Sequence, residues 1–319
     1  MLVSAQIPSD TSIADVSFVR HDGIDLVVCA DRWGALWTWS PSTGEWDQPN
    51  LGFAHASDPV MRPYPDATNE FDMIAAASVG GRLLLAGGGD EQEPALWDFT
   101  TGEVVARAPV TGAYLSDVVA HGGRFYTAEQ YSEEVRLWTP GVRGDAVAEV
   151  GSLFCLATAR VGGRDLLLAG GEGVVVHTAD THVELASFAP YDGRVWGVTA
   201  CEANERSLII GVTENGRLCV WDLDDGGEEE IYEPVTATEG SLENVEVLTV
   251  GGRPLAVTPA DGGGLRLWDV TDGSEAGHVE ASGHGVTAME TASADGRTVL
   301  VTGGFDGVVR LWEASDLTQ

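Results

Sequence analysis

The sequence predicts an all-β fold made of one repeated antiparallel unit. Its best-formed copy is Thr302–Trp312, in which a β-branched strand leads into a turn rich in glycine and aspartate, and a second strand ends on tryptophan. Looser copies are Thr258–Asp269, Gly211–Asp222 and Ala86–Asp98. A repeat of this kind indicates a series of similar sheets in one domain, although the length alone would suggest two domains of roughly 150 residues.

The aromatic residue that closes the unit recurs along the whole chain. The equivalent positions are Trp39, Trp97, Trp138, His177, Trp221, Trp268 and Trp312. All intervals but the first are close to the roughly 40–45 residues of one blade in a repeat protein of this kind. Paired-glycine turns such as Gly80-Gly81-Arg82 and Gly122-Gly123-Arg124 mark the hairpins between first and second strands. Seven anchors therefore predict seven sheets.

The order of aliphatic strand, aspartate turn, aliphatic strand and tryptophan, often followed by aspartate, resembles the WD-repeat β-propeller family, in particular bacterial WD-repeat proteins. The resemblance covers residues 1–319. It implies a single seven-bladed β-propeller of four-stranded antiparallel blades. The last blade ends just past Trp312 and lacks an outer strand, so we expect Leu2–Ile7 to pair with Val308–Trp312 and close the ring.

The long first interval places an insertion at Trp46–Asp72. This segment holds four prolines, too many for a regular strand, and we expect a long loop between blades one and two. Arg62 and Tyr64 lie within it. Two interpretations stay open, a tethered cover over blades one and two and a flap that binds a partner or ligand.

Composition narrows the classes of function. The chain has 17 Lys+Arg, all of them arginine, against 50 Asp+Glu, which leaves a formal charge of −33. The absence of lysine excludes a Schiff-base lysine, and the acidic surface argues against nucleic acid as a partner. Cys29, Cys155, Cys201 and Cys219 lie in apolar runs and predict core thiols in a reducing compartment. Without a signal peptide or an apolar span, we expect a cytoplasmic protein that does not bind membranes.

One blade matches the family's structural hydrogen-bond tetrad in full. The resemblance implies that His284, Thr302, Asp306 and Trp312 link by side-chain hydrogen bonds and staple blade seven. The histidine, aspartate and threonine also resemble a nucleophilic triad, but the same positions are structural in the family. We find no phosphate-binding loop, nucleophile elbow or metal-ligand spacing, so no catalytic residue, metal or cofactor is expected. The acidic run after Trp221 leaves calcium as a minor alternative.

The remaining candidates are surface residues. In the family, the starts of the inner strands and the turns between second and third strands form one face that binds peptides or proteins. Aromatic and arginine side chains often dominate such contacts. The candidate partner-binding residues at these places, with those of the insertion, are Trp33, Arg62, Tyr64, Phe71, Tyr114, Tyr131, Phe154, Arg194, Trp196 and Phe305.

These observations lead to a functional hypothesis with one rival. We expect a monomeric, non-catalytic interaction scaffold that binds a protein or peptide segment, and the excess of carboxylates favours a basic segment. The alternative is an enzyme or small-molecule binder whose site lies at the mouth of the central channel, under the Trp46–Asp72 loop.

Overall fold

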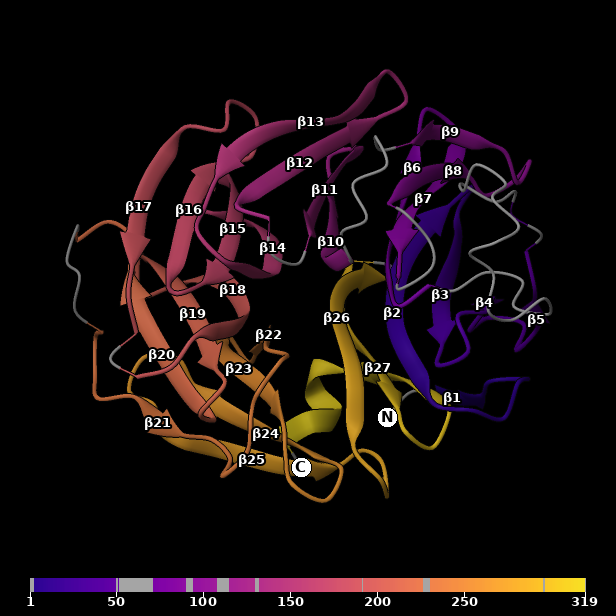
Figure 1. Cartoon of the computed structure of the whole chain (residues 1–319). Coiled ribbons are helices and arrows are strands. Elements are labelled where there is room, and N and C mark those ends of the chain that lie inside the picture. Colours follow the sequence, from indigo (N-terminus) through magenta and orange to yellow (C-terminus); the bar gives the residue numbers. More distant parts are fainter. Residues whose placement is uncertain are drawn as a thin grey trace.

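The computed structural model describes residues 3–49, 51, 71–89, 94–107, 115–129, 132–190, 192–225, 230–294 and 296–318. These residues form seven four-stranded antiparallel sheets, which stand as blades around a common centre (Figure 1). The fold is therefore a seven-bladed β-propeller. In each blade the first strand lies nearest the centre and the fourth lies outermost.

The strands follow the blades in chain order. Blade one holds β2 (Ile13–His21), β3 (Ile24–Asp31), β4 (Leu36–Trp39) and β5 (Trp46–Asp47); blade two holds β6 (Met73–Val79), β7 (Arg82–Gly88), β8 (Ala95–Asp98) and β9 (Val104–Arg107); blade three holds β10 (Leu115–His121), β11 (Arg124–Glu129), β12 (Glu134–Thr139) and β13 (Val142–Glu149); blade four holds β14 (Leu153–Val161), β15 (Arg164–Gly171), β16 (Val174–Thr178) and β17 (Glu184–Phe188). Blade five holds β18 (Val195–Ala203), β19 (Arg206–Thr213), β20 (Arg217–Asp222) and β21 (Val235–Thr236); blade six holds β22 (Glu246–Val250), β23 (Arg253–Pro259), β24 (Gly264–Asp269) and β25 (Glu275–Glu280); blade seven holds β26 (Val286–Ala294), β27 (Arg297–Gly304) and β28 (Val308–Glu313). A short 3-10 helix, η2 (Ala314–Thr318), follows β28.

The N-terminal strand closes the ring, as the sequence predicts. β1 (Val3–Gln6) pairs antiparallel with β28 and becomes the outermost strand of blade seven. The register runs from Val3 opposite Leu311 to Gln6 opposite Val308. Just beyond β1, the Ile7 N–H donates to the Gly307 carbonyl at 2.8 Å. Blade seven is thus built from both ends of the described chain.

The hydrophobic core is divided among the interfaces between blades. In the described residues seven buried clusters occur, each shared by two neighbouring blades. The predicted anchors lie inside them or at their edges, and all six tryptophans and His177 are buried. Because a blade buries its faces only against its two neighbours, stability depends on an unbroken ring.

Three of the anchor tryptophans make the same polar contact. The indole Nε1–H donates to a second-strand threonine in blades three, six and seven, at 2.9 Å for Trp138–Thr127 and 3.0 Å for both Trp268–Thr258 and Trp312–Thr302. Blade five has Gly211 at this level, against the ring of Trp221, and the Trp221 Nε1 atom is buried without a partner in the described residues. The blades are therefore stapled unevenly.

Arginines that follow the turns between first and second strands meet the Trp-Asp pairs of the sequence in space. Arg82 and Arg253 belong to Gly-Gly-Arg turns, and Arg206 follows Asn204-Glu205. The arginine that opens the second strand bonds the aspartate that ends the third, as in Arg82–Asp98 at 2.7 Å and Arg206–Asp222 at 2.5 Å, and Arg253–Asp269 is a third such pair. Burial alone raises the pKa of Asp98, but the bond from Arg82 and those from the Thr100 and Thr101 N–H groups outweigh it and lower the pKa. Each aspartate so engaged holds a strand end and the turn that follows.

The insertion after blade one begins later than predicted. Trp46–Asp47 is not loop but the short outer strand β5, because Trp46 pairs with Trp39 and stacks on its ring at 6.1 Å between centroids. At the other end of the segment, Phe71 is buried and Asp72 donates its N–H to Gly88. Residues 50 and 52–70 lie outside the described chain, so the choice between cover and flap stays a prediction.

Ring closure can be tested at Ile7. This side chain is 1% exposed and belongs to the cluster between blades seven and one. Ile7→Ala is expected to lower the free energy of unfolding by about 2–4 kcal/mol through lost burial and the cavity left behind. Ile24→Ala, at a position 51% exposed, is the matched control and should change it by less than about 1 kcal/mol. Chemical denaturation measures both, and equal effects would contradict the closure argument.

The indole–threonine staple gives a second test. Thr302→Val keeps the shape of the side chain but leaves the buried Trp312 Nε1–H without its acceptor. We expect a loss of about 1–3 kcal/mol in the free energy of unfolding. Thr249→Val, on an exposed position of β22, should be nearly neutral. A neutral Thr302→Val variant would show that the bond contributes nothing to stability.

Candidate binding face at the mouth of the ring

Strand register defines which ends of the blades share a face. The start of each inner strand lies beside the end of the second strand, as Ile13 opposite Asp31, Val195 opposite Thr213 and Val286 opposite Gly304 show. The turns between second and third strands therefore lie at the same end of the ring as the starts of the inner strands. We call this end the front face.

Phe154, Arg194 and Trp196 form a cluster on the front face of blades four and five. The rings of Phe154 and Trp196 have centroids 6.0 Å apart, and the Arg194 guanidinium lies 5.7 Å from the Phe154 centroid. Glu172 pairs with Arg194 at 3.2 Å between Oε1 and Nε. Trp196 Nε1 is a buried atom without a partner in the described residues. These three residues were predicted separately, and the fold brings them together.

Trp33 and Phe305 are large apolar side chains left in solvent on this face. Trp33 is 74% exposed and Phe305 is 52% exposed. Both turns are held firmly by aspartates. Asp31 Oδ1 accepts from the N–H groups of Trp33 and Ala35 at 2.9 and 3.0 Å, and Asp31 Oδ2 accepts from Trp37 Nε1 at 3.1 Å. The exposed aromatic rings therefore project from ordered turns and not from loose chain.

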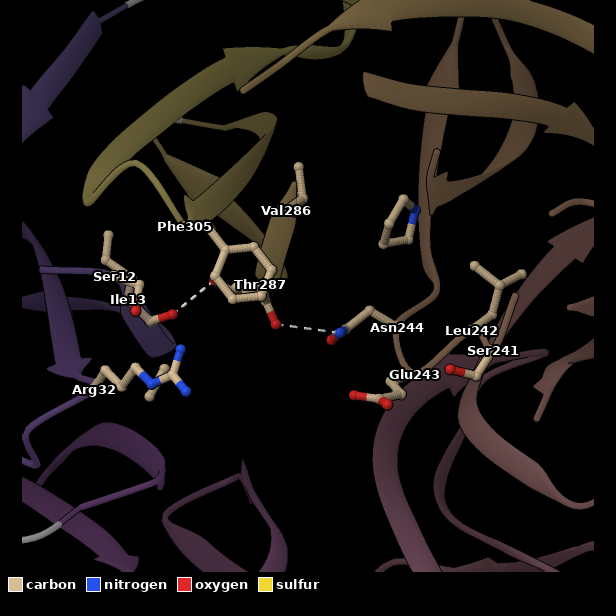
Figure 2. A pocket seen from close by; sticks show the side chains of 12 residues that line it. Ser12, Ile13, Arg32, Ser241, Leu242, Glu243, Asn244, Val286, Thr287 and Phe305 are labelled. Atoms are coloured by element: carbon tan, nitrogen blue, oxygen red, sulfur yellow. Dashed lines mark hydrogen bonds between the residues drawn. The ribbon is translucent and has the colours of Figure 1, made fainter. Parts of the chain in front are cut away.

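A pocket of about 550 Å³ opens between blades one, six and seven. Apolar walls come from Ile13, Leu242, Val286 and Phe305, with polar groups between them. Figure 2 shows the Arg32 and Glu243 side chains on opposite sides, with their charged ends turned toward the space between them. We call this cavity the mouth pocket.

The wall of the mouth pocket is fastened across blades. Asn244 Nδ2 donates to the Thr287 carbonyl at 3.3 Å, which links blades six and seven (Figure 2). The Thr287 hydroxyl lies 2.7 Å from the Ile13 carbonyl of blade one and 3.1 Å from the Gly303 carbonyl. Three blades are thus tied together around the same opening, and the pocket walls are set by main-chain positions.

Several predicted site residues lie elsewhere. Phe71 is not a surface residue: it is fully buried, with its ring 5.0 Å from that of Trp97, because the start of β6 is covered by the turn of blade one. Arg62, Tyr64, Tyr114 and Tyr131 lie outside the described residues. Sequence reasoning missed Arg32 and Glu243, although the position of Arg32 beside Trp33 in one turn was a usable signal.

The predicted tetrad of blade seven is only half formed. Trp312 and Thr302 are bonded, but His284 lies exposed in the turn before β26, where its backbone N–H bonds the Ser282 hydroxyl at 3.3 Å. Asp306 instead pairs with Arg310 at 2.6 Å and accepts from the Val308 N–H. Although burial raises its pKa, the bonds from Arg310 and Val308 bring that pKa below its usual value. Within the described residues the His284 side chain has no aspartate to orient it, so the arrangement fits neither a staple nor a triad.

Four carboxyl groups lie near the centre of the ring and serve neighbouring blades. Asp15 accepts from the Ile74 N–H of blade two at 2.8 Å, and Asp117 accepts from the Leu156 N–H of blade four at 2.7 Å. Glu290 accepts from the Phe18 N–H of blade one, and Glu246 bonds the Thr291 hydroxyl of blade seven at 2.6 Å. The free edge of an inner strand needs such partners, since its main-chain donors have no fifth strand.

Desolvation at this position has a large effect on ionisation. It raises the pKa of Asp15 and Glu290 to about 8 and the pKa of Asp117 and Glu246 to about 7, and their mutual repulsion adds to the rise for Asp15, Glu246 and Glu290. Within the described ranges, no three His, Cys, Asp or Glu residues are placed to hold a metal ion. The bonds to neighbouring blades make these carboxyl groups interblade hydrogen-bond partners.

The four cysteines are free thiols. Cys29, Cys155 and Cys219 are buried and Cys201 is half-buried. Burial raises the pKa of Cys201 and Cys219 to about 12 and raises that of Cys29 and Cys155 as well. A thiol that stays protonated is a poor nucleophile, so these residues are core components. No helix in the described part of the chain is long and apolar enough to cross a membrane.

Comparison with known proteins agrees with the fold. No protein-family model and no curated protein matches the sequence. Among solved structures, the chain is similar to the crystal structure of the computationally designed Ika8 protein, with a TM-score of 0.61 and 14% sequence identity over 95% of this chain and 96% of that one. At this identity the likeness shows the fold alone. The site must be argued from its own residues.

The central carboxyl groups predict how stability depends on pH. Their pKa values are raised in the folded state, so the folded chain holds protons that the unfolded chain has released. This contribution is complete below about pH 4 and is lost as the pH rises through about 7–8. We expect a higher melting temperature at pH 5 than at pH 8.

Substitution separates this effect from the general repulsion of an acidic chain. Asp117→Asn removes one titrating group and should reduce the difference between the two melting temperatures. Asp225→Asn changes an exposed carboxylate and should leave the difference unchanged. Melting curves of the three proteins at both pH values provide the measurement, and identical differences in all three would refute the role of Asp117.

Proposed function

We propose that this chain is a non-catalytic interaction scaffold of the WD-repeat type, which binds a protein or peptide segment on its front face. The observation that carries the proposal is the gathering of aromatic and arginine side chains from blades one, four, five and seven on that face. They are Trp33, Phe154, Arg194, Trp196 and Phe305. Such side chains are the ones that most often dominate the energy of protein contacts.

The side chains of Trp33 and Phe305 do not hold the turns in which they lie. The ring of Trp33 is mostly in solvent, and its turn is held by Asp31 and not by the indole. Phe305 is half exposed at the rim of the mouth pocket. Leaving large apolar side chains in water forgoes the free energy of burying them, and exposed apolar patches often mark binding sites. A partner that covers both rings would recover that burial.

Charge on the face favours a basic segment. Glu172, Glu214 and Glu243 lie on turns or strand starts of blades four to six, near the Phe154–Trp196 cluster or the mouth pocket. The formal charge of −33 adds a long-range field that attracts cations. Complementary charge raises association rates and excludes wrong partners more than it adds affinity. The aromatic residues supply the affinity in this proposal, and the carboxylates supply the choice of partner.

Sequence and structure together support the remaining details. The free thiols fit a reducing compartment, so we infer a cytoplasmic location. The acidic surface disfavours nucleic acid, and we propose a monomer because the blades already form a closed ring.

A second candidate function rests on the mouth pocket. Its volume of about 550 Å³ lies in the range of small-molecule sites, and Arg32, Glu243 and Asn244 supply polar groups on apolar walls. In this alternative the chain is an enzyme or a small-molecule binder, and the part of the insertion that follows β5 is the lid. Saturable binding of a metabolite with no captured protein would favour this alternative over the scaffold.

The scaffold is tested by affinity capture with the full chain as bait. Trp33→Ala and Trp196→Ala should each reduce recovery of the partner by about tenfold or more, since truncation of a central aromatic contact typically costs about 2 kcal/mol. Ile24→Ala is the control, because Ile24 is an exposed apolar residue at the opposite end of blade one. Unchanged recovery with both tryptophan variants would rule out the front face as the binding surface.

A further inference from the structure

Arg32 stands apart from the other arginines of the chain. Among the arginines whose side chains the structure describes, it alone has no interaction partner for its guanidinium. Arg107 also has a partner, and the others bond carboxylates, carbonyls or hydroxyls. The chain has 50 acidic residues for 17 arginines, so a partner is easy to supply. An unpaired guanidinium in such an acidic protein is therefore available to bind an anionic group of a ligand.

The surroundings of Arg32 are those of a binding pocket. The residue lines the mouth pocket, and its main chain is fixed because its N–H donates to the Ser12 carbonyl at 2.9 Å. Glu243 lines the opposite wall and also has no side-chain partner in the described residues (Figure 2). The apolar surface between them includes the exposed ring of Phe305, with Trp33 next to Arg32 in sequence.

We propose that the mouth pocket binds the C-terminal end of a peptide, whose carboxylate pairs with Arg32 while a nearby basic side chain pairs with Glu243. This inference rests on the proposed scaffold function and specifies the segment that the front face receives. An apolar side chain of the same peptide lies against Phe305. The ligand is thus a short sequence that carries both a negative and a positive group.

Charge balance supports a carboxylate over a phosphate. A single arginine faces a single glutamate, so a ligand with one charge of each sign leaves the pocket neutral. A phosphate monoester carries a charge of about −1.5 to −2 at neutral pH and would be repelled by Glu243 and by the acidic chain around it. The planar guanidinium can form a bidentate pair with either anion, so the charge balance with Glu243 decides between them.

The shape of the site supports a chain end over an internal acidic residue. The pocket lies between three blades that are tied together by the Asn244–Thr287 and Thr287–Ile13 bonds. A chain end can enter such a concavity with one segment. An internal aspartate or glutamate would have to bring both flanking segments to the mouth, beside Trp33 and Phe305.

The test uses peptide pools, because the partner's sequence is open. A pool of N-acetylated tetrapeptides, randomised at every position, is made with a free C-terminal carboxylate, and a second pool is made as the C-terminal amide. A third, amidated pool carries aspartate at its last position. Each is passed over the immobilised full chain, and retained peptides are identified by mass spectrometry.

We expect the free-acid pool to be retained about tenfold or more over the amide pool, the size of one charge-assisted contact. Retained peptides should be enriched in arginine or lysine. Arg32→Ala should abolish the preference for the free acid, and Glu243→Gln should abolish the basic enrichment alone. Arg160→Ala is the matched control, since Arg160 is an exposed arginine on the opposite face, with Asp165 only at 3.8 Å. Thermal melts should show that all variants are folded.

Other results would overturn the inference. Equal retention of acid and amide pools, no retention of either, or retention unaffected by Arg32→Ala would each reject it. Better retention of the aspartate pool than of the free-acid pool would show that Arg32 binds an internal acidic side chain and not a C-terminal carboxylate. If Trp196→Ala abolishes partner capture while the free-acid preference is absent, the scaffold stands and only the mouth-pocket assignment fails.

Discussion

The pairing of β1 with β28 is the constraint on which the remaining structure depends. A blade has two faces, and each is buried only by the neighbouring blade, so an incomplete ring would leave faces of its end blades without partners. The cluster between blades seven and one joins Ile7 and Trp39 to Val301 and Val309. Residues about three hundred positions apart must therefore meet before the last interface can form. Bringing the two ends together costs conformational entropy of the chain, and this cost arises before the burial of apolar side chains at the last interface offsets it.

The roles of the many acidic residues can be assigned only from their places in the closed ring of blades. Some hold turns, as Asp31 does under Trp33; some bond the arginine of a Gly-Gly-Arg turn, as Asp98 does; and some serve the inner edges, as Asp15 does. In the sequence these residues look alike, because each is a carboxylate in a chain that has 50. Their different roles follow from position. A carboxylate beside an N–H group or a guanidinium forms a stabilising charge-assisted hydrogen bond, and a carboxylate in solvent does not.

The sequence was sufficient for the fold because the determining features are local. Strand periodicity, glycine turns and the recurring tryptophan each occupy a few residues, and seven copies reinforce one another. The site was only partly predictable. The exposure of Trp33 and Phe305 was predictable because both lie in turns, and their role in binding stays a prediction. The surface position expected for Phe71 was wrong, because the start of an inner strand can be covered by the turn of the blade before it. His284 was placed by family analogy, which does not register that Arg310 already occupies Asp306.

Arg32 shows most clearly what sequence reasoning lacks. Whether an arginine is unpaired depends on the fold, since here no carboxylate of the described residues comes within reach of the Arg32 guanidinium. The same turn position in blade seven holds Phe305, followed by an aspartate that an arginine of its own blade satisfies. In blade one, Asp31 is instead satisfied by the backbone N–H groups of its own turn and by Trp37, and Arg32 points into the mouth pocket. The repeat thus gives every blade the same strands and turns. The blades differ in the group that bonds the turn aspartate, and this difference decides which turn side chains stay available for a partner.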